Sequence, residues 1–362
     1  MMLPSSLLVK PVSANCNLDC EYCFYKRKKR LFPRAKVMTD EVLEEMTSQF
    51  MDIRTSQASF SWQGGEPLLA GLDFYRRAVE LQQKHGRGHT VSNAFMTNGT
   101  LLDAQWVDFF REYKFLVGIS LDGPRRLHDV YRRKPDGSPT FDLVMKGIGL
   151  LKGADVDFNV LTVVNDVNVD HPEEIYDFLI ENDIKHMQFV PCYEIDPETG
   201  EGKPFNVSSD SYGEFLCRVF DLWKRDFPDV YIRMFNSVLA MRLGREHGLC
   251  TLGPRCGEYV VIEHNGDVYP CDFFVERDTY LGNIMEESLG RIVEKTALRE
   301  FSRQKSRLDR ECQQCEWVDL CFGGCQYHRK GPGHERRSCF CPSYKRFFEY
   351  SDDAYLELES LV

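Results

Sequence analysis

The chain has 362 residues, of which 43% are hydrophobic and 28% charged, and its formal net charge at pH 7 is −11. This length allows one large α/β domain and a smaller second domain, and the ordinary composition excludes fibrous and disordered classes. Because a strongly acidic chain repels nucleic-acid phosphates, we expect no nucleic-acid partner.

The first part of the chain alternates between strand-like and helix-like segments. Apolar or β-branched runs predict strands at 7–12, 58–62, 91–97, 115–121, 158–164 and 187–192. Amphipathic stretches predict helices between them, at 40–53, 72–85, 103–112, 141–151 and 172–182. Six such strands predict a parallel α/β sheet, either an open or partial barrel or a doubly wound sheet. Ligands of these sheets bind at the carboxyl ends of the strands.

The pattern changes after about Phe235, where cysteines become frequent. Nine of the 14 cysteines lie between Cys250 and Cys341. The segment 259–274 predicts a β-hairpin with Asn265-Gly266 as a two-residue turn, and helix-like stretches cover 287–303 and begin again near Ser343. We therefore expect a core domain at 1–235 and a cysteine-rich domain with a hairpin and helices at 236–362.

No stretch resembles a signal peptide or a membrane span, so we expect a cytoplasmic protein without a membrane partner. In that compartment cysteines bind metal or carry out chemistry more often than they form disulfides. A basic run at 26–30, with Arg34 and Lys36 close behind it, is either a solvated loop or a surface that steers an acidic partner or electron donor.

The first cysteine cluster has the spacing Cys16-x3-Cys20-x2-Cys23, on a loop after the first predicted strand. Three thiolates so close together can hold one face of an iron–sulfur cubane, and the missing fourth ligand leaves one iron open for an exogenous ligand. The alternatives are a zinc site, which lacks its fourth ligand here, or three ordinary core cysteines.

The second cysteine set is built around the spacing C-x2-C-x5-C-x3-C that starts at Cys312. Four thiolates per site fit either zinc ribbons or iron–sulfur clusters. Cys192 and Cys217 stand apart from both sets and are expected to pack as small apolar residues.

The first cluster, with Tyr22 just before its last cysteine, resembles the motif of the radical S-adenosylmethionine superfamily. Gln63-Gly64-Gly65-Glu66-Pro67 after the second strand resembles the Gly-Gly-Glu-Pro motif of the same superfamily. The resemblance implies a partial (β/α)6 TIM-like barrel and a [4Fe–4S] cluster. S-adenosylmethionine would bind the open iron of that cluster and be cleaved to a 5′-deoxyadenosyl radical.

The resemblance also implies a set of S-adenosylmethionine contacts. Gly65 would let the backbone approach the methionine amino group. Ser120 would contact the ribose or carboxylate, Arg132 would pair with the carboxylate, and Tyr193 would contact the adenine. Taken singly, Ser120, Arg132 and Tyr193 fit ordinary strand-end or surface roles equally well.

The C-terminal cysteines resemble the SPASM domain, which carries two auxiliary [4Fe–4S] clusters, three clusters in all. Matching the positions assigns the ligands of the first auxiliary cluster as Cys250, Cys256, Cys271 and Cys325. The ligands of the second would be Cys312, Cys315, Cys321 and Cys341. Cys339 is an extra thiol that could replace Cys341, although the segment after Cys341 resembles the family's.

Over nearly its whole length the chain resembles anaerobic sulfatase-maturating enzymes. This resemblance rests on the segments Leu-Leu-Val-Lys-Pro at 7–11, Cys-Phe-Tyr at 23–25, 115–124 and 268–274. It implies oxidation of a cysteine or serine in a sulfatase polypeptide to Cα-formylglycine, with the auxiliary clusters accepting an electron and a flavodoxin- or ferredoxin-like protein donating one. Asp272 would be the general base, and Gln63 and Tyr25 would contact the substrate.

Two alternatives remain at this point. Another SPASM peptide maturase, forming thioether or carbon–carbon crosslinks, would have no general need for an aspartate beside Cys271. A zinc-binding scaffold without catalytic activity would be colourless, whereas a protein with three iron–sulfur clusters is brown.

Overall fold

The computed structural model describes residues 3–33, 36–54, 56–196, 198–329 and 336–360. The chain folds into two compact units, each assembled from separated segments. The first comprises residues 1–120, 132–158 and 257–302, and the second comprises residues 121–131, 159–256 and 303–362.

The first unit contains a mainly parallel sheet. Strand β1 (Ser6–Lys10) pairs with β2 (Gln57–Trp62), which pairs with β3 (Thr90–Thr97), and β3 pairs with β4 (Leu116–Ser120). On its other edge β1 pairs in parallel with β8 (Tyr259–Glu263). The antiparallel strands β9 (Asp267–Tyr269) and β10 (Gly282–Asn283) extend the sheet beyond β8.

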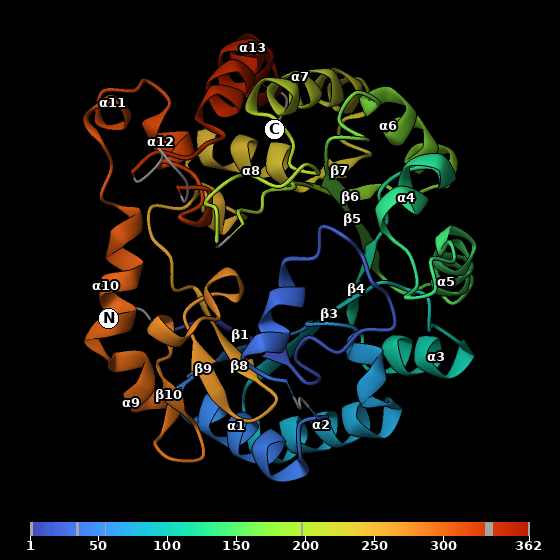
Figure 1. Ribbon diagram of the computed structural model, residues 1–362, viewed down its shortest axis with the longest axis vertical. Helices are drawn as coiled ribbons and strands as arrows, with labels where there is room; N and C mark the ends of the chain where they lie inside the picture. The colour runs from blue at the N-terminus through green and yellow to red at the C-terminus, as the bar shows by residue number, and fades with distance from the viewer. Residues whose placement is uncertain (1–2, 34–35, 55, 197, 330–335, 361–362) are drawn as a thin grey trace. The chain divides into compact units, whose positions relative to one another are not determined.

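Helices α1 (Asp40–Ile53), α2 (Leu72–His85) and α3 (Ala104–Glu112) run along one side of these strands (Figure 1). Thr39 and Asp103 cap α1 and α3 by accepting hydrogen bonds from backbone amides of the first turn. The core beneath these helices is aromatic, with the Tyr75 ring 5.4 Å from Trp62 and 5.0 Å from Phe95. Helices α5 (Phe141–Gly153) and α9 (Leu289–Glu294) also belong to this unit.

The second unit contains strands β5 (Phe158–Val164), β6 (His186–Pro191) and β7 (Tyr231–Ile232), which pair in parallel in this order. Its core lies between long helices, where the Phe220 ring is 5.0 Å from Tyr355 and the Phe235 ring is 5.2 Å from Phe347. The helices of this unit are α4 (Arg125–Tyr131), α6 (Pro172–Glu181), α7 (Ser209–Asp226), α8 (Arg233–Arg242), α11 (Arg310–Gln313), α12 (Val318–Cys321) and α13 (Cys341–Glu359).

The structure confirms a mixed α/β fold with a parallel sheet, six predicted strands and five predicted helices, all within a few residues of their predicted limits. Two details of the C-terminal prediction are wrong. The stretch 287–303 is two helices, α9 and α10 (Thr296–Lys305), because Lys295 between them has an extended backbone with ψ 143°. The hairpin turn has three residues, 264–266, with Gly266 at φ 88°, a left-handed conformation typical of three-residue hairpin loops.

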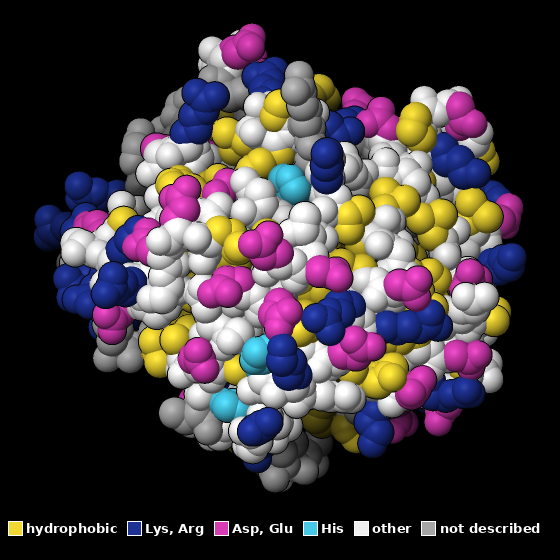
Figure 2. All heavy atoms as spheres, turned by 90° about the horizontal axis from the view of Figure 1, so that it is seen from below, with side chains coloured by type: hydrophobic (Ala, Val, Ile, Leu, Met, Phe, Trp, Pro, Cys, Tyr) yellow, Lys and Arg dark blue, Asp and Glu magenta, His cyan; other side chains and the backbone are white. Residues whose placement is uncertain are grey.

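Acidic and basic side chains are interspersed on the face shown in Figure 2, rather than separated into patches of one sign. Among the helices in the described ranges, none is both long and apolar enough to cross a membrane.

Candidate active site

The first cysteine cluster lies in the loop between β1 and a 3-10 helix at Phe24–Arg30. Cys16, Cys20 and Cys23 are all partly buried there, and the Leu18 amide donates to the Cys16 sulfur at 3.3 Å. Burial raises the pKa of the Cys16 thiol to about 12, and burial raises the pKa of Cys23 as well. Without a metal, these buried thiols therefore favour their neutral, protonated form. A bound cation favours the thiolate instead, because coordination removes the thiol proton, so the loop suits a metal cluster.

The glycine-rich loop after β2 lies directly against the backbone that leads into Cys16. Gly65 donates its amide hydrogen to the Ser13 carbonyl at 2.6 Å, and Glu66 donates to the Asn15 carbonyl at 2.7 Å. A Cβ atom on Gly65 would stand 1.9 Å from the Asn15 oxygen, which no side chain can tolerate. Glycine is therefore required here because the loop packs directly against the Asn15 backbone. The approach of the Gly65 backbone to the methionine amino group of the cofactor remains a prediction.

Glu66 has a structural part that the sequence did not reveal. Its carboxyl group is fully buried and accepts hydrogen bonds from the Thr97 hydroxyl at 2.7 Å and the Asn98 amide at 2.8 Å. Burial raises the pKa of Glu66 to about 7. The side chain thus ties the glycine loop to the carboxyl end of β3.

Asn98 connects this strand end to the cysteine loop. The nitrogen of its side-chain amide donates a hydrogen bond to the side-chain oxygen of Asn17 at 2.9 Å and lies 3.7 Å from the Cys16 sulfur. The side-chain amide of Asn17 donates in turn to the Thr100 hydroxyl at 2.8 Å. Nothing in the sequence pattern distinguishes these residues from ordinary turn residues, because their role depends on the pairing of β1, β2 and β3.

Two other predicted cofactor contacts lie in the same unit. Arg132 is buried with its guanidinium 5.5 Å from the centre of the Tyr22 ring, so the charge and the aromatic residue of the motif meet. Ser120 is the last residue of β4, at the carboxyl end of the sheet. The roles assigned to these residues remain predictions.

Asp272 lies at the start of a 3-10 helix, Asp272–Phe274, that follows the β8–β9 hairpin. It is 9% exposed, and it accepts a hydrogen bond from the Tyr259 hydroxyl at 3.0 Å on one oxygen and from the Gln63 amide at 3.3 Å on the other. Lys10 at the end of β1 is 3.9 Å from the same oxygen as Gln63. The structure therefore brings together Asp272 and Gln63, which the sequence proposed as base and substrate contact.

Lys10 belongs to a buried group that the sequence analysis missed. Its ammonium is 4.6 Å above the Tyr25 ring, and the Tyr25 hydroxyl hydrogen-bonds to the fully buried Glu263. Burial lowers the pKa of Lys10, while the charges of Asp272 and Glu263 oppose that shift. The hydroxyl of Tyr25 is thus engaged by Glu263, and its proposed contact with substrate remains a prediction.

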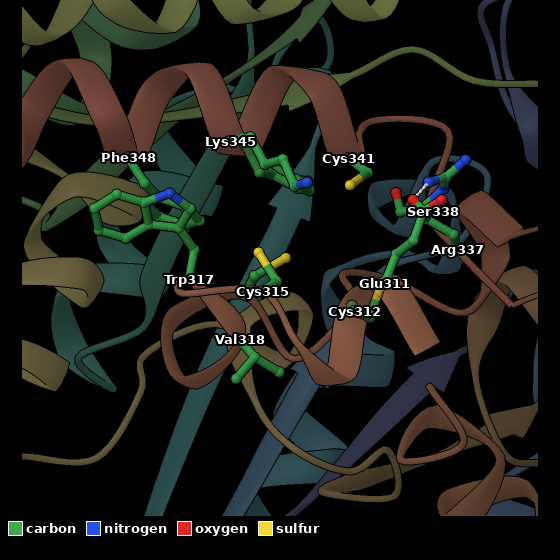
Figure 3. Close-up of a pocket in the computed structure, with 13 residues that line it drawn as sticks. Glu311, Cys312, Cys315, Trp317, Val318, Arg337, Ser338, Cys341, Lys345 and Phe348 are labelled. Atoms are coloured by element: carbon green, nitrogen blue, oxygen red, sulfur yellow. Dashed lines mark hydrogen bonds and ion pairs between the residues drawn. The ribbon is translucent and has the colours of Figure 1, made fainter. Parts of the chain in front are cut away.

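The four cysteines assigned to the second auxiliary cluster line a pocket in the second unit. Cys312, Cys315 and Cys341 converge on the same space (Figure 3), and Cys321 also lines it. Trp317 and Phe348 supply apolar walls, and an ion pair between Glu311 and Arg337 lies beside Cys312. No three histidine, cysteine or acidic side chains of the described ranges stand close enough together to bind one ion. The thiolates of a four-iron cluster each bind a different iron and stand further apart.

Cys339 is directed elsewhere. It is absent from the lining of this pocket and interacts instead with the Tyr193 hydroxyl. Burial raises the pKa of Tyr193, and the interaction with Cys339 raises it further. Tyr193 follows β6 and packs edge-on against His328 and Phe340, at ring-centre distances of 5.6 Å and 5.8 Å. The geometry favours Cys341 over Cys339 as the fourth thiol of the pocket.

The four cysteines assigned to the first auxiliary cluster are divided between the two units. Cys250, Cys256 and Cys325 belong to the second unit and Cys271 to the first. Burial raises the pKa of Cys325 to about 11, and the negative charge of Cys256 adds to the shift. Their joint ligation with Cys271 remains a prediction. Cys192 and Cys217 are buried, as expected, and the described residues contain no disulfide.

The basic run is not a wholly solvated loop. Lys28 in its middle is 1% exposed and donates to the Val275 carbonyl at 2.7 Å, whereas its neighbours Lys29 and Arg30 are exposed. Arg34 lies outside the described residues.

A three-cysteine loop beside a glycine loop at strand ends, with a separate cysteine pocket, defines a radical S-adenosylmethionine enzyme with an auxiliary iron–sulfur domain. Two family models agree: the radical SAM superfamily matches residues 11–179, and the iron–sulfur cluster-binding SPASM domain matches residues 250–316.

Similar proteins narrow this class. A serine-type anaerobic sulfatase-maturating enzyme of Bacteroides thetaiotaomicron is 40% identical over 96% of this chain and 89% of its own length. A cysteine-type enzyme of Clostridium perfringens is 39% identical over 97% of both chains. The solved structure "Native anSMEcpe with bound AdoMet" matches with a TM-score of 0.92 and 36% identity over 99% of this chain and 100% of that chain. A second structure, of the same enzyme with AdoMet and the Cp18Cys peptide, has the same TM-score and covers 99% of both chains.

The chain belongs to the anaerobic sulfatase-maturating enzymes, which are radical S-adenosylmethionine oxidoreductases that modify proteins. Membership of this family argues against both alternative interpretations of the sequence, the zinc-binding scaffold and the crosslinking maturase.

Proposed function

We propose that the enzyme oxidises a cysteine or serine side chain of a sulfatase polypeptide to Cα-formylglycine, with Asp272 as the general base. The observation that carries this proposal is the environment of Asp272. The carboxylate is nearly buried, oriented by Tyr259 and Gln63, and adjacent to Cys271 in the chain. A relative in this family has been solved with a bound peptide, which supports a polypeptide substrate.

The residues around Asp272 suit proton removal. The Tyr259 hydroxyl and the Gln63 amide hold one carboxylate oxygen each, so the group is fixed before substrate arrives. Orientation matters because a general base must lie within about 3 Å of the proton that it removes. The Lys10 ammonium balances the negative charge of the carboxylate in this buried setting.

The cofactor assignment follows the cysteines. We propose three [4Fe–4S] clusters: one on Cys16, Cys20 and Cys23, one on Cys250, Cys256, Cys271 and Cys325, and one on Cys312, Cys315, Cys321 and Cys341. When bound, the first cluster with S-adenosylmethionine would supply the radical that removes a hydrogen atom from the substrate β-carbon, and an auxiliary cluster would accept the electron that the substrate then loses. For a cysteine substrate, water would hydrolyse the resulting thioaldehyde and release the sulfur as hydrogen sulfide. The chain's own residues would hold this cofactor through the Gly65 backbone, Arg132, Ser120, Tyr22 and Tyr193.

The region 236–362 is proposed as the auxiliary cluster domain, and the matched SPASM range 250–316 lies inside it. A flavodoxin- or ferredoxin-like protein is proposed as the electron donor. Serine-type and cysteine-type relatives are almost equally similar to this chain, so identity favours neither target residue.

The test is anaerobic incubation of the reconstituted enzyme with S-adenosylmethionine, a reductant, and two sulfatase-derived peptides that differ only in a cysteine or serine at the target position. Mass spectrometry should detect an aldehyde in at least one peptide, and chromatography should detect 5′-deoxyadenosine. Absence of aldehyde in both peptides, with deoxyadenosine formed, would refute the proposed reaction.

Asp272→Asn tests the base. This variant should keep its iron and still form deoxyadenosine but lose aldehyde formation, because the amide cannot accept the proton. Asp278→Asn is the matched control, since Asp278 is exposed on the same segment. Full aldehyde formation by the Asp272 variant would remove the carboxylate from the mechanism.

A further inference from the structure

Lys28 is an unusual member of the basic run because its side chain is buried. Its ammonium donates to the Val275 carbonyl at 2.7 Å and lies 3.4 Å from the Phe273 carbonyl. These carbonyls follow Asp272 by three residues and one residue. A buried ammonium is costly unless oxygen atoms satisfy it, so the contact fixes both partners.

A second contact joins the same two segments. The Phe24 ring lies 4.7 Å from the Phe273 ring, centre to centre, and Phe24 directly follows Cys23. The 3-10 helix after the first cysteine cluster thus holds the Asp272–Phe274 segment at two points, one apolar and one charged.

The two segments are far apart in the sequence but carry the two halves of the proposed chemistry. One follows the cysteine loop and the other begins with the proposed base. Val275 is fully buried with Leu8, Val261 and Tyr269, so the carbonyl that Lys28 binds belongs to a rigid part of the core. A cation placed there determines where Asp272 lies relative to the cysteine loop.

We propose that Lys28 is a positioning residue that fixes the position of the Asp272 carboxylate relative to the first cysteine cluster. This inference rests on the proposed function of Asp272 as the base. Lys28 touches neither substrate nor cofactor, and it acts through the backbone that carries Asp272. Its loss separates radical formation from product formation, because the base no longer lies where the substrate proton is released.

The test measures aldehyde formed per 5′-deoxyadenosine in the reconstituted full-length enzyme, together with kcat, KM for the peptide and iron content. Lys28→Met should lower aldehyde per deoxyadenosine by about tenfold to a hundredfold, the effect of an ångström-scale displacement of a catalytic group. The change should fall on kcat rather than KM. Lys28→Arg, which still donates to carbonyls, should restore most of the ratio. Lys29→Met, at the exposed neighbour, should match the wild type.

A merely structural lysine would lower the yield of folded protein and leave the ratio of the two products unchanged, and that outcome would overturn the proposal. Loss of iron from Lys28→Met would also overturn it, because Lys28 would then support Cys271 rather than Asp272. If Lys28→Met does not accumulate as folded protein, Lys28→Gln, which keeps one amide donor, is measured in the same way.

The two proposals fail differently. An inactive Asp272→Asn with an unaffected Lys28 series would reject the positioning role alone. An active Asp272→Asn would reject the base, whatever the Lys28 series shows.

Discussion

Replacing Gly65 by alanine should abolish S-adenosylmethionine binding. The new Cβ would stand 1.9 Å from the Asn15 carbonyl oxygen and 2.4 Å from its carbon, and real Cβ contacts essentially never fall below 3.0 Å. One of the two loops must therefore retreat by about 1.1 Å, which is the overpacking displacement that costs roughly 1–3 kcal/mol.

This retreat would have a specific consequence, because Asn15 immediately precedes Cys16. The hydrogen bonds from Gly65 to Ser13 and from Glu66 to Asn15, at 2.6 Å and 2.7 Å, hold the two loops together, and each contributes about 0.5–1.5 kcal/mol. The alanine variant should lose both bonds and displace the backbone that carries the first cluster.

The assay is isothermal titration with S-adenosylmethionine under anoxia, with iron content and thermal unfolding measured on the same samples. Gly149→Ala is the matched control, because a Cβ on Gly149 in α5 meets no atom within 4 Å. That control should bind the cofactor normally and be as stable as the wild type or slightly more so. Normal binding by Gly65→Ala would refute the steric reasoning.

Three further predictions address the other sites. Cys341→Ser should lose iron from one cluster while Cys339→Ser keeps it, as measured by iron content, because only Cys341 lines the pocket; equal iron loss in both would contradict the ligand assignment. Lys10→Met should lower the melting temperature, because it leaves Asp272 without its buried cation. The double variant Lys10→Met/Asp272→Asn should lower the melting temperature by less than the sum of the two single changes. Strict additivity of the changes in melting temperature would show that the pair does not interact. The pKa of Glu66, raised by burial to about 7 from 4.5, means that the folded state keeps a proton that the unfolded state has lost, so stability from this group falls by about 3 kcal/mol as pH rises from about 4.5 to above 7. Glu66→Gln should therefore narrow the difference in melting temperature between pH 5 and pH 8, and an unchanged difference would count against a buried neutral carboxyl.

Local signals in the sequence were sufficient for most of the fold. Helices α1 and α2 have the predicted bounds, because their apolar periodicity and flanking residues are properties of short segments. The break at Lys295 and the three-residue turn at Gly266 escaped prediction, since each depends on backbone angles that composition alone does not fix.

The cysteine spacings and the glycine motif could likewise be read from the sequence. Metal ligands on one loop must be close in the chain, so Cys16, Cys20 and Cys23 mark their site directly. Gln63 and Asp272 were found only through resemblance, and their contact at 3.3 Å joins residues that are 209 positions apart in the chain.

The sequence by itself determined the strand and helix order, the cluster-binding loop and the class of chemistry, because these are written in spacings of a few residues. Only the tertiary structure decided which buried groups surround Asp272. The parallel pairing of β1 with β8 sets Lys10 opposite Glu263, and Lys28 reaches the carbonyls after Asp272 across a similar distance in the chain. Such partners are chosen by strand register and by the need to satisfy a buried charge, and neither leaves a local pattern in the sequence.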